Sequence, residues 1–404
     1  MPEHDDATDV PWARARARAR ARDAGRPLPR LHRELHDALG HALAEPLTAL
    51  TDLPPFDSSA MDGWAVAGPG PWRLRAGQAL AGTEPEPLAD GVAVGIATGA
   101  QLPPGRAAVL RREHGRVESA TGLLVDRTAT LPEPGRDVRK RGQECQVGEP
   151  LLPAGTTVTP AVLGLAAAAG YDRLVVHRAP TVELLVLGDE LLDSGSPRGG
   201  RVRDALSPML APWLRGGAEV IGRRRIPDAA EPLHEALRDS AADVVITTGS
   251  TAAGPVDFLH ATLAELGARL LVDSVAVRPG HPMLLAELPR AADGRVRHLV
   301  GLPGNPLAAV AGTVTLAAPL LDALGGRAEA EFQQATAAAD LRGHPRNTSL
   351  VPVELRSGAA APLPFGGPAM LRGLALADGF AAVPPGGLRT GDAVRVIALP
   401  HSRA

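Results

Sequence analysis

The sequence is poor in cysteine and in aromatic residues, and both shortages exclude classes of protein. Cys145 is the one cysteine among 404 residues, so the chain has no internal disulfide framework and no multi-cysteine metal site. So little cysteine fits a reducing compartment, and we expect a cytoplasmic protein. Aromatic residues make up 2% of the chain, against 45% for all hydrophobic residues, so the cores must consist of Leu, Val and Ala.

A net positive charge, a membrane segment and several common catalytic motifs are also missing. The net charge of −3 argues against a general nucleic-acid binder. No apolar run approaches the roughly 20 residues of a membrane span, and the acidic N-terminus MPEHDDATDV lacks the apolar core of a secretory signal. The sequence has no HExxH, GxSxG, GxxxxGK[ST] or CxxC motif, which disfavours zinc proteolysis, a serine-esterase elbow and a Walker A site.

A run of arginines alternates with alanine near the N-terminus: Arg14, Arg16, Arg18, Arg20 and Arg22. A spacing of two residues distributes charge around a helix axis and forms no stripe. Arg and Ala both favour helix, so one interpretation is a solvated helix, and the alternative is an arm that binds a polyanion.

The rest of the chain divides into β-rich and α/β parts. Residues 28–47 carry helical apolar spacing, residues 72–141 form short apolar pieces between turn residues, and Thr159 with Pro160 suits the start of a helix. From about residue 176, buried strands alternate with helices, which predicts a parallel-rich sheet covered on both faces. We expect Ser207 with Pro208 to begin one of these helices, Asp228 to cap the next, and ARLLVDSVAV to form a single strand. Short strands and turns return after residue 326.

We therefore expect a multidomain α/β protein, in which a central α/β domain is accompanied by small β-rich domains. The predicted parts are a flexible Arg/Ala-rich arm of residues 1–26, a linking domain of residues 27–50 and 142–175, a small β-rich domain of residues 51–141, an α/β domain of residues 176–326 and a C-terminal β-rich domain of residues 327–404.

Three loops of the α/β part follow predicted strands and carry acids, hydroxyl groups or glycines. Their residues are Asp189, Glu190, Thr248, Gly249, Ser250, Gly304 and Asn305. Ligands of open parallel sheets bind beyond the carboxyl ends of the strands, where such residues let backbone N–H groups approach an anion at a helix N-terminus. Acids beside a phosphate need a divalent cation between them, so the loops together predict a phosphorylated ligand with Mg²⁺.

Each of these features also has a purely structural interpretation. A single glycine-rich strand–helix turn is common, and Asp257 suits a plain helix N-cap as well as a ligand. Arg278 ends the predicted strand SVAVR, ahead of His281 on the next loop. An arginine there is able to hold a phosphate, and a solvated charge is the alternative.

In order along the chain, several motifs resemble the molybdopterin molybdenumtransferases, the family of MoeA and the gephyrin E domain. The matching stretches are DLPPFDSSAMDGWAV, IATGAQLPPG, GRDVRKRGQECQVGEPLLPAGT, LGDELL, DVVITTGS with GPVD, VRPGHP and GLPGNPLAAV. They cover roughly residues 28–400, and the first and last are highly specific.

The resemblance implies a fold, an activity and partners. It implies an elongated homodimer of four-domain subunits with an α/β domain of molybdopterin-binding type. It also implies an enzyme that binds adenylylated molybdopterin and molybdate, hydrolyses the adenylate with Mg²⁺ and inserts molybdenum into the dithiolene. The implied partners are an upstream molybdopterin adenylyltransferase and molybdoenzymes or their chaperones, without membrane or nucleic acid.

Site residues follow from the same motifs. The resemblance implies that four acids and one hydroxyl residue are catalytic: Asp62, Thr98, Glu190, Asp228 and Asp257. It also implies that four acids bind the metal: Glu190, Asp257, Asp62 and Glu144. The implied substrate-binding residues are Thr248, Gly249, Ser250, Arg278, His281, Pro303, Gly304, Asn305 and Pro306. Asp62 would face the nucleotide and metal of the partner subunit, and Trp64 would pack the turn that holds Asp62.

This sequence departs from the family pattern at several positions. Ser274 replaces a Lys, Leu206 an Asn, Arg203 an aromatic residue and Ala107 an acid, and the loop TGSTAAG lacks a second glycine. Three hypotheses therefore stand: a working molybdenumtransferase, a catalytically weakened paralogue that binds or delivers the cofactor, and a scaffold that contacts a protein or polyanion through the Arg-Ala arm.

Overall fold

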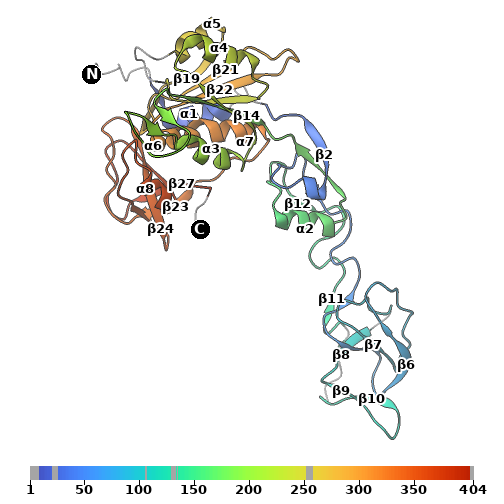
Figure 1. The fold of residues 1–404 in the computed structure, drawn as a ribbon. Coiled ribbons are helices and arrows are strands. Elements are labelled where there is room, and N and C mark those ends of the chain that lie inside the picture. The colour runs from blue at the N-terminus through green and yellow to red at the C-terminus, as the bar shows by residue number, and fades with distance from the viewer. Residues whose placement is uncertain are drawn as a thin grey trace.

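The computed structural model describes residues 9–20, 26–104, 107–128, 133, 135–251 and 258–400. The molecule is elongated (Figure 1): an α/β body with a β-rich unit beside it lies at one end, and a narrow linking unit leads from it to a small β-rich unit at the other end. The predicted multidomain α/β fold is confirmed.

The α/β body is built on a six-stranded sheet in the order β17-β14-β18-β22-β21-β19. Its parallel strands are β17 (Glu219–Ile226), β14 (Thr181–Leu187), β18 (Val244–Thr248) and β22 (Arg297–Leu302). β21 (Leu284–Leu288) and β19 (Arg269–Asp273) complete one edge in antiparallel pairing. The sheet is therefore parallel-rich, as predicted, with an antiparallel edge that the alternating pattern does not reveal.

The segment ARLLVDSVAV, expected as one strand, is two strands in different sheets. Ser274 lies between them with a φ of +60°. After it, β20 (Val275–Arg278) joins the C-terminal sheet by pairing with β24. Both halves are apolar, so the pattern alone cannot show the change of sheet.

Helices cover both faces of the body's sheet. One face carries α3 (Leu206–Leu214) and a long helix composed of α6 (Pro306–Gly312), a π-helical stretch (Thr313–Ala317) and α7 (Ala318–Leu324). The other face carries α4 (Ala230–Asp239) and α5 (Leu259–Glu265). The predicted covering on both faces is confirmed, and Leu and Ala from these helices form the two cores.

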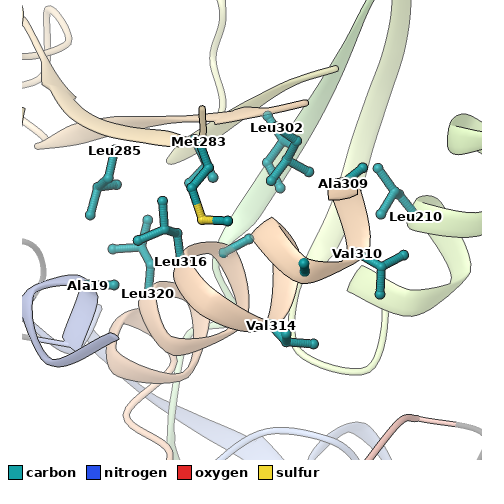
Figure 2. Close-up of a cluster of buried hydrophobic side chains, with 14 of the residues drawn as sticks. Ala19, Leu210, Met283, Leu285, Leu302, Ala309, Val310, Val314, Leu316 and Leu320 are labelled. Carbon is teal, nitrogen blue, oxygen red and sulfur yellow. The ribbon is translucent and has the colours of Figure 1, made fainter. Parts of the chain in front are cut away.

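The long helix Pro306–Leu324 is the most buried element of the body. Figure 2 shows Leu316 and Leu320 packed toward Met283 and Leu285 of the sheet, and Ala309 and Val310 beside Leu210 of α3. By length and composition this 19-residue helix is able to span a membrane, although 83% of its most apolar window is buried inside the protein. The expectation that no apolar run approaches that length is therefore wrong, and the burial explains the composition.

The Arg-Ala segment forms a packed helix, α1 (Trp12–Arg20), not a solvated one. Trp12, Ala15, Arg16 and Ala19 are buried at the spacing i, i+3, i+4, i+7, which is one face of a helix. Trp12 Nε1 donates to Thr315 Oγ1 at 3.0 Å, and Arg16 donates to the Val314 carbonyl. The alternating alanines leave room on this face, so the helix lies close against the long helix.

The linking unit differs from expectation at its start. The helix expected within residues 28–47 is wrong: β2 (Arg30–Glu34) pairs with β13 (Arg173–His177), and a single 3₁₀ turn (Leu35–Asp37) follows β2. β3 (Leu47–Thr48) pairs with β12 (Pro150–Leu152). α2 (Pro160–Ala168) begins as predicted, since Thr159 accepts the Val162 N–H at 3.3 Å.

Two β-rich units complete the chain. The small unit has a six-stranded sheet of β8 (Ala107–Arg111), β5 (Gly63–Ala67), β7 (Val92–Ile96), β6 (Trp72–Ala79), β10 (Leu123–Asp126) and β9 (Gly115–Val117), and the pair β4 (Ser58–Ser59) and β11 (Val138–Arg139) leads to it. The C-terminal sheet joins β1 (Val10–Pro11) and β20 to β24 (Thr348–Arg356), β25 (Ala359–Pro362), β23 (Gln333–Ala337), β27 (Ala393–Ala398) and β26 (Gly379–Val383), and α8 (Arg372–Leu376) lies beside it.

Candidate functional site

A cleft of about 730 Å³ lies beyond the carboxyl ends of the body's parallel strands. The predicted residues that line it are Glu190, Asp228, Thr248, Gly249, Ser250, Pro303, Gly304, Asn305 and Pro306. They come from four separate loops, which follow β14, β17, β18 and β22. The parallel sheet therefore brings to one edge the loops that the sequence suggests should meet.

Glycines let the backbones of two loops approach each other at the floor of the cleft. Gly249 has a φ of +95°, and a Cβ there would lie 3.3 Å from the Leu187 carbonyl oxygen. A Cβ on Gly304 would lie 3.7 Å from Gly249 Cα, which shows how closely the β18 and β22 loops pass. A ligand in the cleft therefore meets backbone rather than bulky side chains.

The cleft is acidic. Among the described residues that line it, Glu190, Asp204 and Asp228 are acids and Arg203 is the one cation. Glu190 is exposed at the mouth, whereas Asp204 is buried. A phosphate would be repelled by such a wall unless a divalent cation lay between the two charges.

Asp228 has a different structural role from the one expected. α4 has Ala229 at its N-cap position, with no side-chain capping bond, so the predicted Asp228 cap is wrong. Asp228 Oδ2 instead accepts the Asp189 N–H at 3.1 Å. This bond holds the loop of Glu190 against the loop after β17.

Asp204 is a cleft residue that the sequence reasoning missed. Its Oδ1 accepts the N–H groups of Leu206 and Ser207 at 3.0 and 3.1 Å, and its Oδ2 accepts a 3.0 Å bond from Arg223. Asp204 therefore starts α3, where the sequence suggests Ser207. An Asp shortly before the first turn of a helix is a common capping pattern, so the sequence itself indicates that Asp204 starts α3.

The segments next to Glu190 and Asp204 pair with each other and form part of the cleft lining. β15 (Leu191–Leu192) pairs in parallel with β16 (Val202–Arg203), and Val202 N–H donates to the Glu190 carbonyl at 2.9 Å. The position of Glu190 thus depends on residues beyond its own loop.

The start of the long helix is already hydrogen-bonded. The N–H groups of Leu307 and Ala308 donate to the Pro368 carbonyl at 2.9 and 3.3 Å. Ala369, next to this carbonyl, lines the cleft. The C-terminal unit therefore takes the two donors that would otherwise face an anion at this helix N-terminus.

Arg278 and His281 are predicted substrate residues that do not line the cleft. Arg278 Nη1 donates to the neighbouring Val277 carbonyl at 3.3 Å. His281 Nε2 lies 2.6 Å from Asp9 Oδ2, so its ring faces the N-terminal segment. Their loop reaches the cleft through Pro282 instead.

Asp62 and Thr98 lie together, but in the small β-rich unit. Asp62 Oδ1 accepts the Thr98 N–H at 2.7 Å and the Thr98 hydroxyl at 2.9 Å. The Thr98 backbone bond, then its hydroxyl bond, lowers the pKa of Asp62 below its usual range. The small unit stands away from the α/β body (Figure 1), so within one chain this pair does not reach the cleft.

The neighbours of Asp62 explain the composition of its motif. A Cβ on Gly63 would lie 2.1 Å from the Leu110 carbonyl oxygen, so only glycine allows β5 to pair there with β8. Trp64 packs on Gly115, where a Cβ would lie 2.4 Å from the Trp64 ring. Glycine and tryptophan thus fix the strand that begins next to Asp62.

Two predicted metal residues contribute nothing to the cleft as the structure describes it. Glu144 is exposed in a turn of the linking region, where its N–H donates to the Leu53 carbonyl at 2.8 Å. Asp257 lies outside the described residues. Within the described ranges, no group of three or more His, Cys, Asp or Glu side chains is placed to hold a metal ion.

The cleft nevertheless fits Mg²⁺ bound together with a phosphate. Mg²⁺ sites commonly use one or two carboxylates, with the remaining ligands from water and substrate phosphates. Glu190 and Asp228 supply two carboxylates in one cleft. These residues, rather than a complete protein cage, would hold the ion.

Comparison with known proteins agrees with this architecture along the whole chain. Residues 10–170 match the model of the MoeA N-terminal region (domains I and II), residues 183–323 that of a probable molybdopterin binding domain, and residues 334–399 that of the MoeA C-terminal region (domain IV).

Individual relatives give the same result. A molybdopterin molybdenumtransferase of Nostoc sp. is 33% identical over 310 residues, 73% of this chain and 70% of that protein. One of Bacillus subtilis is 33% identical over 301 residues, 71% of this chain and 69% of that protein. The crystal structure of a molybdopterin biosynthesis MoeA protein from Pyrococcus horikosii superimposes with a TM-score of 0.73 at 26% identity, covering 97% of this chain and 99% of that one. The chain belongs to the MoeA family of molybdopterin molybdenumtransferases.

Proposed function

We propose that this protein inserts molybdate into adenylylated molybdopterin and releases AMP, as a cytoplasmic step of molybdenum cofactor biosynthesis. The observation that carries the proposal is the acidic cleft, in which nine of the residues expected from the family motifs line one edge of the sheet. Relatives of this chain bear the name molybdopterin molybdenumtransferase.

The charge of the cleft supports a role for Mg²⁺. Glu190 and Asp228 would hold the ion, which would neutralise phosphate charge and polarise the phosphoanhydride when bound. Gly249, Ser250 and Gly304 would present backbone and hydroxyl groups to the substrate. Molybdate and the pterin nucleotide are substrates in this proposal.

The separation of Asp62 and Thr98 from the cleft supports a shared site in a homodimer. Both residues lie in the small unit, which stands at the opposite end of the molecule from the α/β body (Figure 1). In a twofold dimer, the small unit of one subunit would lie over the cleft of the other and add Asp62 to it. An upstream adenylyltransferase would supply the substrate, and molybdoenzymes or their chaperones would accept the product.

Release of AMP tests the proposal. Purified protein, adenylylated molybdopterin, molybdate and Mg²⁺ are combined, and AMP is quantified by chromatography. We expect AMP release that depends on both Mg²⁺ and molybdate, and a loss of about 100-fold or more in Glu190→Ala, because Glu190 would hold the ion at the developing charge.

Glu84→Ala serves as the matched control, since Glu84 is an exposed carboxylate outside the cleft. Its rate should equal that of the wild type. Tight binding of the nucleotide without any turnover would contradict the proposed activity.

A specific feature favours a second candidate, a weakened paralogue that binds or delivers the cofactor. Leu206, where family members carry an Asn, lines the cleft and is 6% exposed. An apolar side chain there removes a hydrogen-bonding group from the substrate wall. Expression in a strain that lacks its molybdenum-insertion enzyme separates the two candidates: restored molybdoenzyme activity supports the transferase, and no restoration with retained cofactor binding supports the paralogue.

A further inference from the structure

A second cleft, of about 320 Å³, lies where the linking unit meets the α/β body. We refer to it as the junction cleft, and its lining consists of Arg33, Leu39, Gly40, His41, Arg178, Ala179, Arg215, Ala218, Glu219 and Arg327. None of these residues lines the cleft at the carboxyl edge of the sheet, so the proposed function does not use them.

The lining of the junction cleft is strongly cationic. The described part of this lining contains four arginines against a single acid, Glu219. The chain as a whole carries a net charge of −3, so this excess of positive charge is local. Like charges gathered at one place repel each other and create a positive potential that attracts anions.

Two of the arginines, Arg327 and Arg178, are held by structural partners, so the excess of positive charge rests mainly on Arg33 and Arg215. Arg327 donates to the Gly217 and Gly40 carbonyls at 2.6 and 2.5 Å, which joins the body to the linking unit through neutral acceptors. Burial lowers the pKa of Arg327, and the nearby charge of Asp322 opposes this shift in part.

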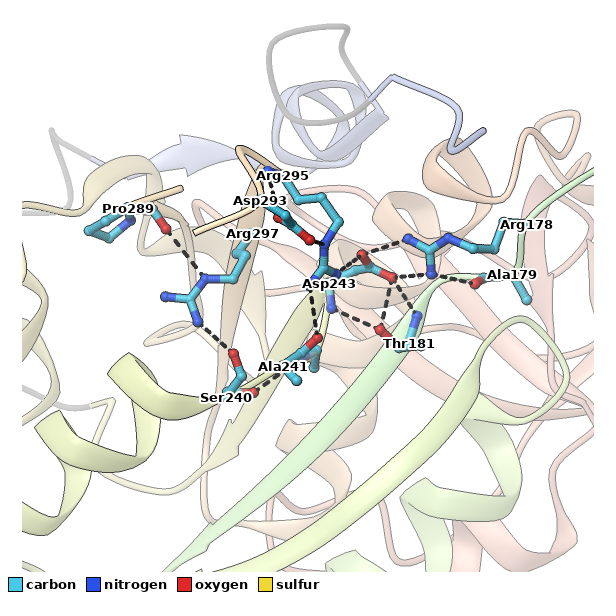
Figure 3. A network of polar contacts seen from close by, with 11 residues as sticks. Arg178, Ala179, Thr181, Ser240, Ala241, Asp243, Pro289, Asp293, Arg295 and Arg297 are labelled. Carbon is cyan, nitrogen blue, oxygen red and sulfur yellow. Dashed lines mark hydrogen bonds and ion pairs between the residues drawn. The ribbon is translucent and has the colours of Figure 1, made fainter. Parts of the chain in front are cut away.

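Arg178 does have a carboxylate partner, but it shares that partner. Its Nη1 and Nη2 donate to Asp243 at 2.9 and 2.8 Å, and Arg295 donates to the same Asp243 at 3.0 Å (Figure 3). Arg295 also pairs with Asp293 at 2.5 Å, so two carboxylates face the two guanidinium groups, and Arg178 adds no surplus charge to the junction cleft.

The other two arginines of the lining are available to a ligand. Within the part of the chain that the structure describes, the side chains of Arg33 and Arg215 have no hydrogen-bond or ion-pair partner. His41 also lines the cleft, where its Nδ1 donates to the His177 carbonyl at 3.0 Å. Arg215 follows the last residue of α3, where one cation favours the helix dipole, but that position does not account for Arg33, which comes from β2.

We propose that the junction cleft binds a tetrahedral oxyanion, the chemistry shared by inorganic phosphate, molybdate and the phosphate group of a small ester. Guanidinium groups bind such oxygens through paired, charge-assisted hydrogen bonds. The volume lies at the lower end of the range of small-molecule pockets. Because Arg33 and His41 belong to the linking unit and Arg215 to the body, the anion would fasten the two units together.

Calorimetric titration of the full chain with inorganic phosphate tests this proposal, with sodium chloride at equal ionic strength as the reference. The variants are Arg33→Gln and Arg215→Gln, and the matched control is Arg342→Gln, an exposed arginine of the C-terminal unit without a side-chain partner in the described structure. We expect saturable phosphate binding, weakened about tenfold by each of the first two substitutions and unchanged in the control.

Titrations with sodium molybdate and phenyl phosphate identify the source of the oxyanion. Stronger binding of one of them assigns the site to that source, and comparable binding of all three assigns it to the shared tetrahedral group. Heats equal to those of chloride would overturn the proposal, and so would phosphate affinities in Arg33→Gln and Arg215→Gln that match the control. Release of AMP should be unchanged in these variants, so a failure here is distinct from a failure of the proposed function.

Discussion

Several side chains in this protein each form bonds to two or more separate segments of the chain. Asp243 is the clearest case: its side chain is 1% exposed and bonds Arg178, Arg295 and both the N–H and hydroxyl of Thr181. Burial by itself would raise the pKa of Asp243, but the bonds from Arg178 and Thr181 outweigh it, and the pKa lies below the ordinary value. The carboxylate is therefore stabilised in its charged form.

Replacement of Asp243 gives a pH-dependent prediction. Because its pKa is lower in the folded than in the unfolded chain, Asp243 stabilises the fold above the ordinary Asp pKa of about 4, and this contribution is lost as the pH falls through the folded-state pKa. Asp243→Asn should reduce the free energy of unfolding by about 2–3 kcal/mol at pH 7, since two half-buried arginines lose charge-assisted bonds to it and Arg295 keeps only Asp293.

Denaturant unfolding monitored between pH 7 and pH 3 measures this effect. The gap between wild type and Asp243→Asn should narrow at the acid end. Asp239→Asn is the control, because Asp239 pairs with Arg238 at a side-chain exposure of 60%, and an exposed pair contributes about 0–1 kcal/mol. A gap that widens as the pH falls would contradict this account.

Among the elements, α1 has a packing role that its composition conceals. Trp12 is 3% exposed and Ala15 and Ala19 are fully buried, all against the long helix. The guanidinium of Arg16 lies over the rings of Trp12 and Phe332, at 5.6 and 5.4 Å from their centroids. This helix therefore connects the α/β body to the C-terminal unit.

Trp12→Ala tests that role. It removes a buried indole and its bond to Thr315, so the free energy of unfolding should fall by about 3–5 kcal/mol. Arg14→Ala, on the exposed side of the same helix, should change it by less than about 0.5 kcal/mol. The measurement is denaturant unfolding followed by circular dichroism. Equal stability of both variants would show that α1 is dispensable, as a solvated arm would be.

At the scale of the whole molecule, elongation separates the two predicted sets of acids. Glu190 and Asp228 line the cleft in the body, whereas Asp62 holds Thr98 in the small unit. In a single chain of this shape, neither the α/β body nor the small unit contains all of the predicted acids (Figure 1). The proposed dimer resolves this, because each site would draw on both subunits.

Mixed dimers test the shared site. Asp62→Ala and Glu190→Ala should each be inactive alone, but subunits mixed in equal amounts and allowed to exchange should recover about a quarter of the wild-type rate of AMP release. Random pairing makes half of the dimers mixed, and each of these contains one intact site. A mixture as inactive as its components would count against a site built from two subunits.

The sequence by itself determined the elements whose periodicity is strong and whose surroundings are local. The strands β14, β17, β18 and β22 and the helices that follow them were predictable because buried strands and amphipathic helices carry different periods, whereas the split between β19 and β20 and the edge strand β21 were not. The loops of Glu190, Gly249 and Gly304 were predictable as neighbours, since parallel strands present their carboxyl ends at one edge. Thr159 was readable as a cap because capping involves residues only three positions apart.

The tertiary structure alone decided the features that depend on distant partners. The strand β2 exists because β13 pairs with it across more than a hundred residues, and α1 is buried because the long helix lies beside it. His281 faces Asp9, and Pro368 occupies the helix start, through contacts that no local pattern encodes. Periodicity reports which face of an element is apolar, whereas pairing and packing between remote segments decide what covers that face.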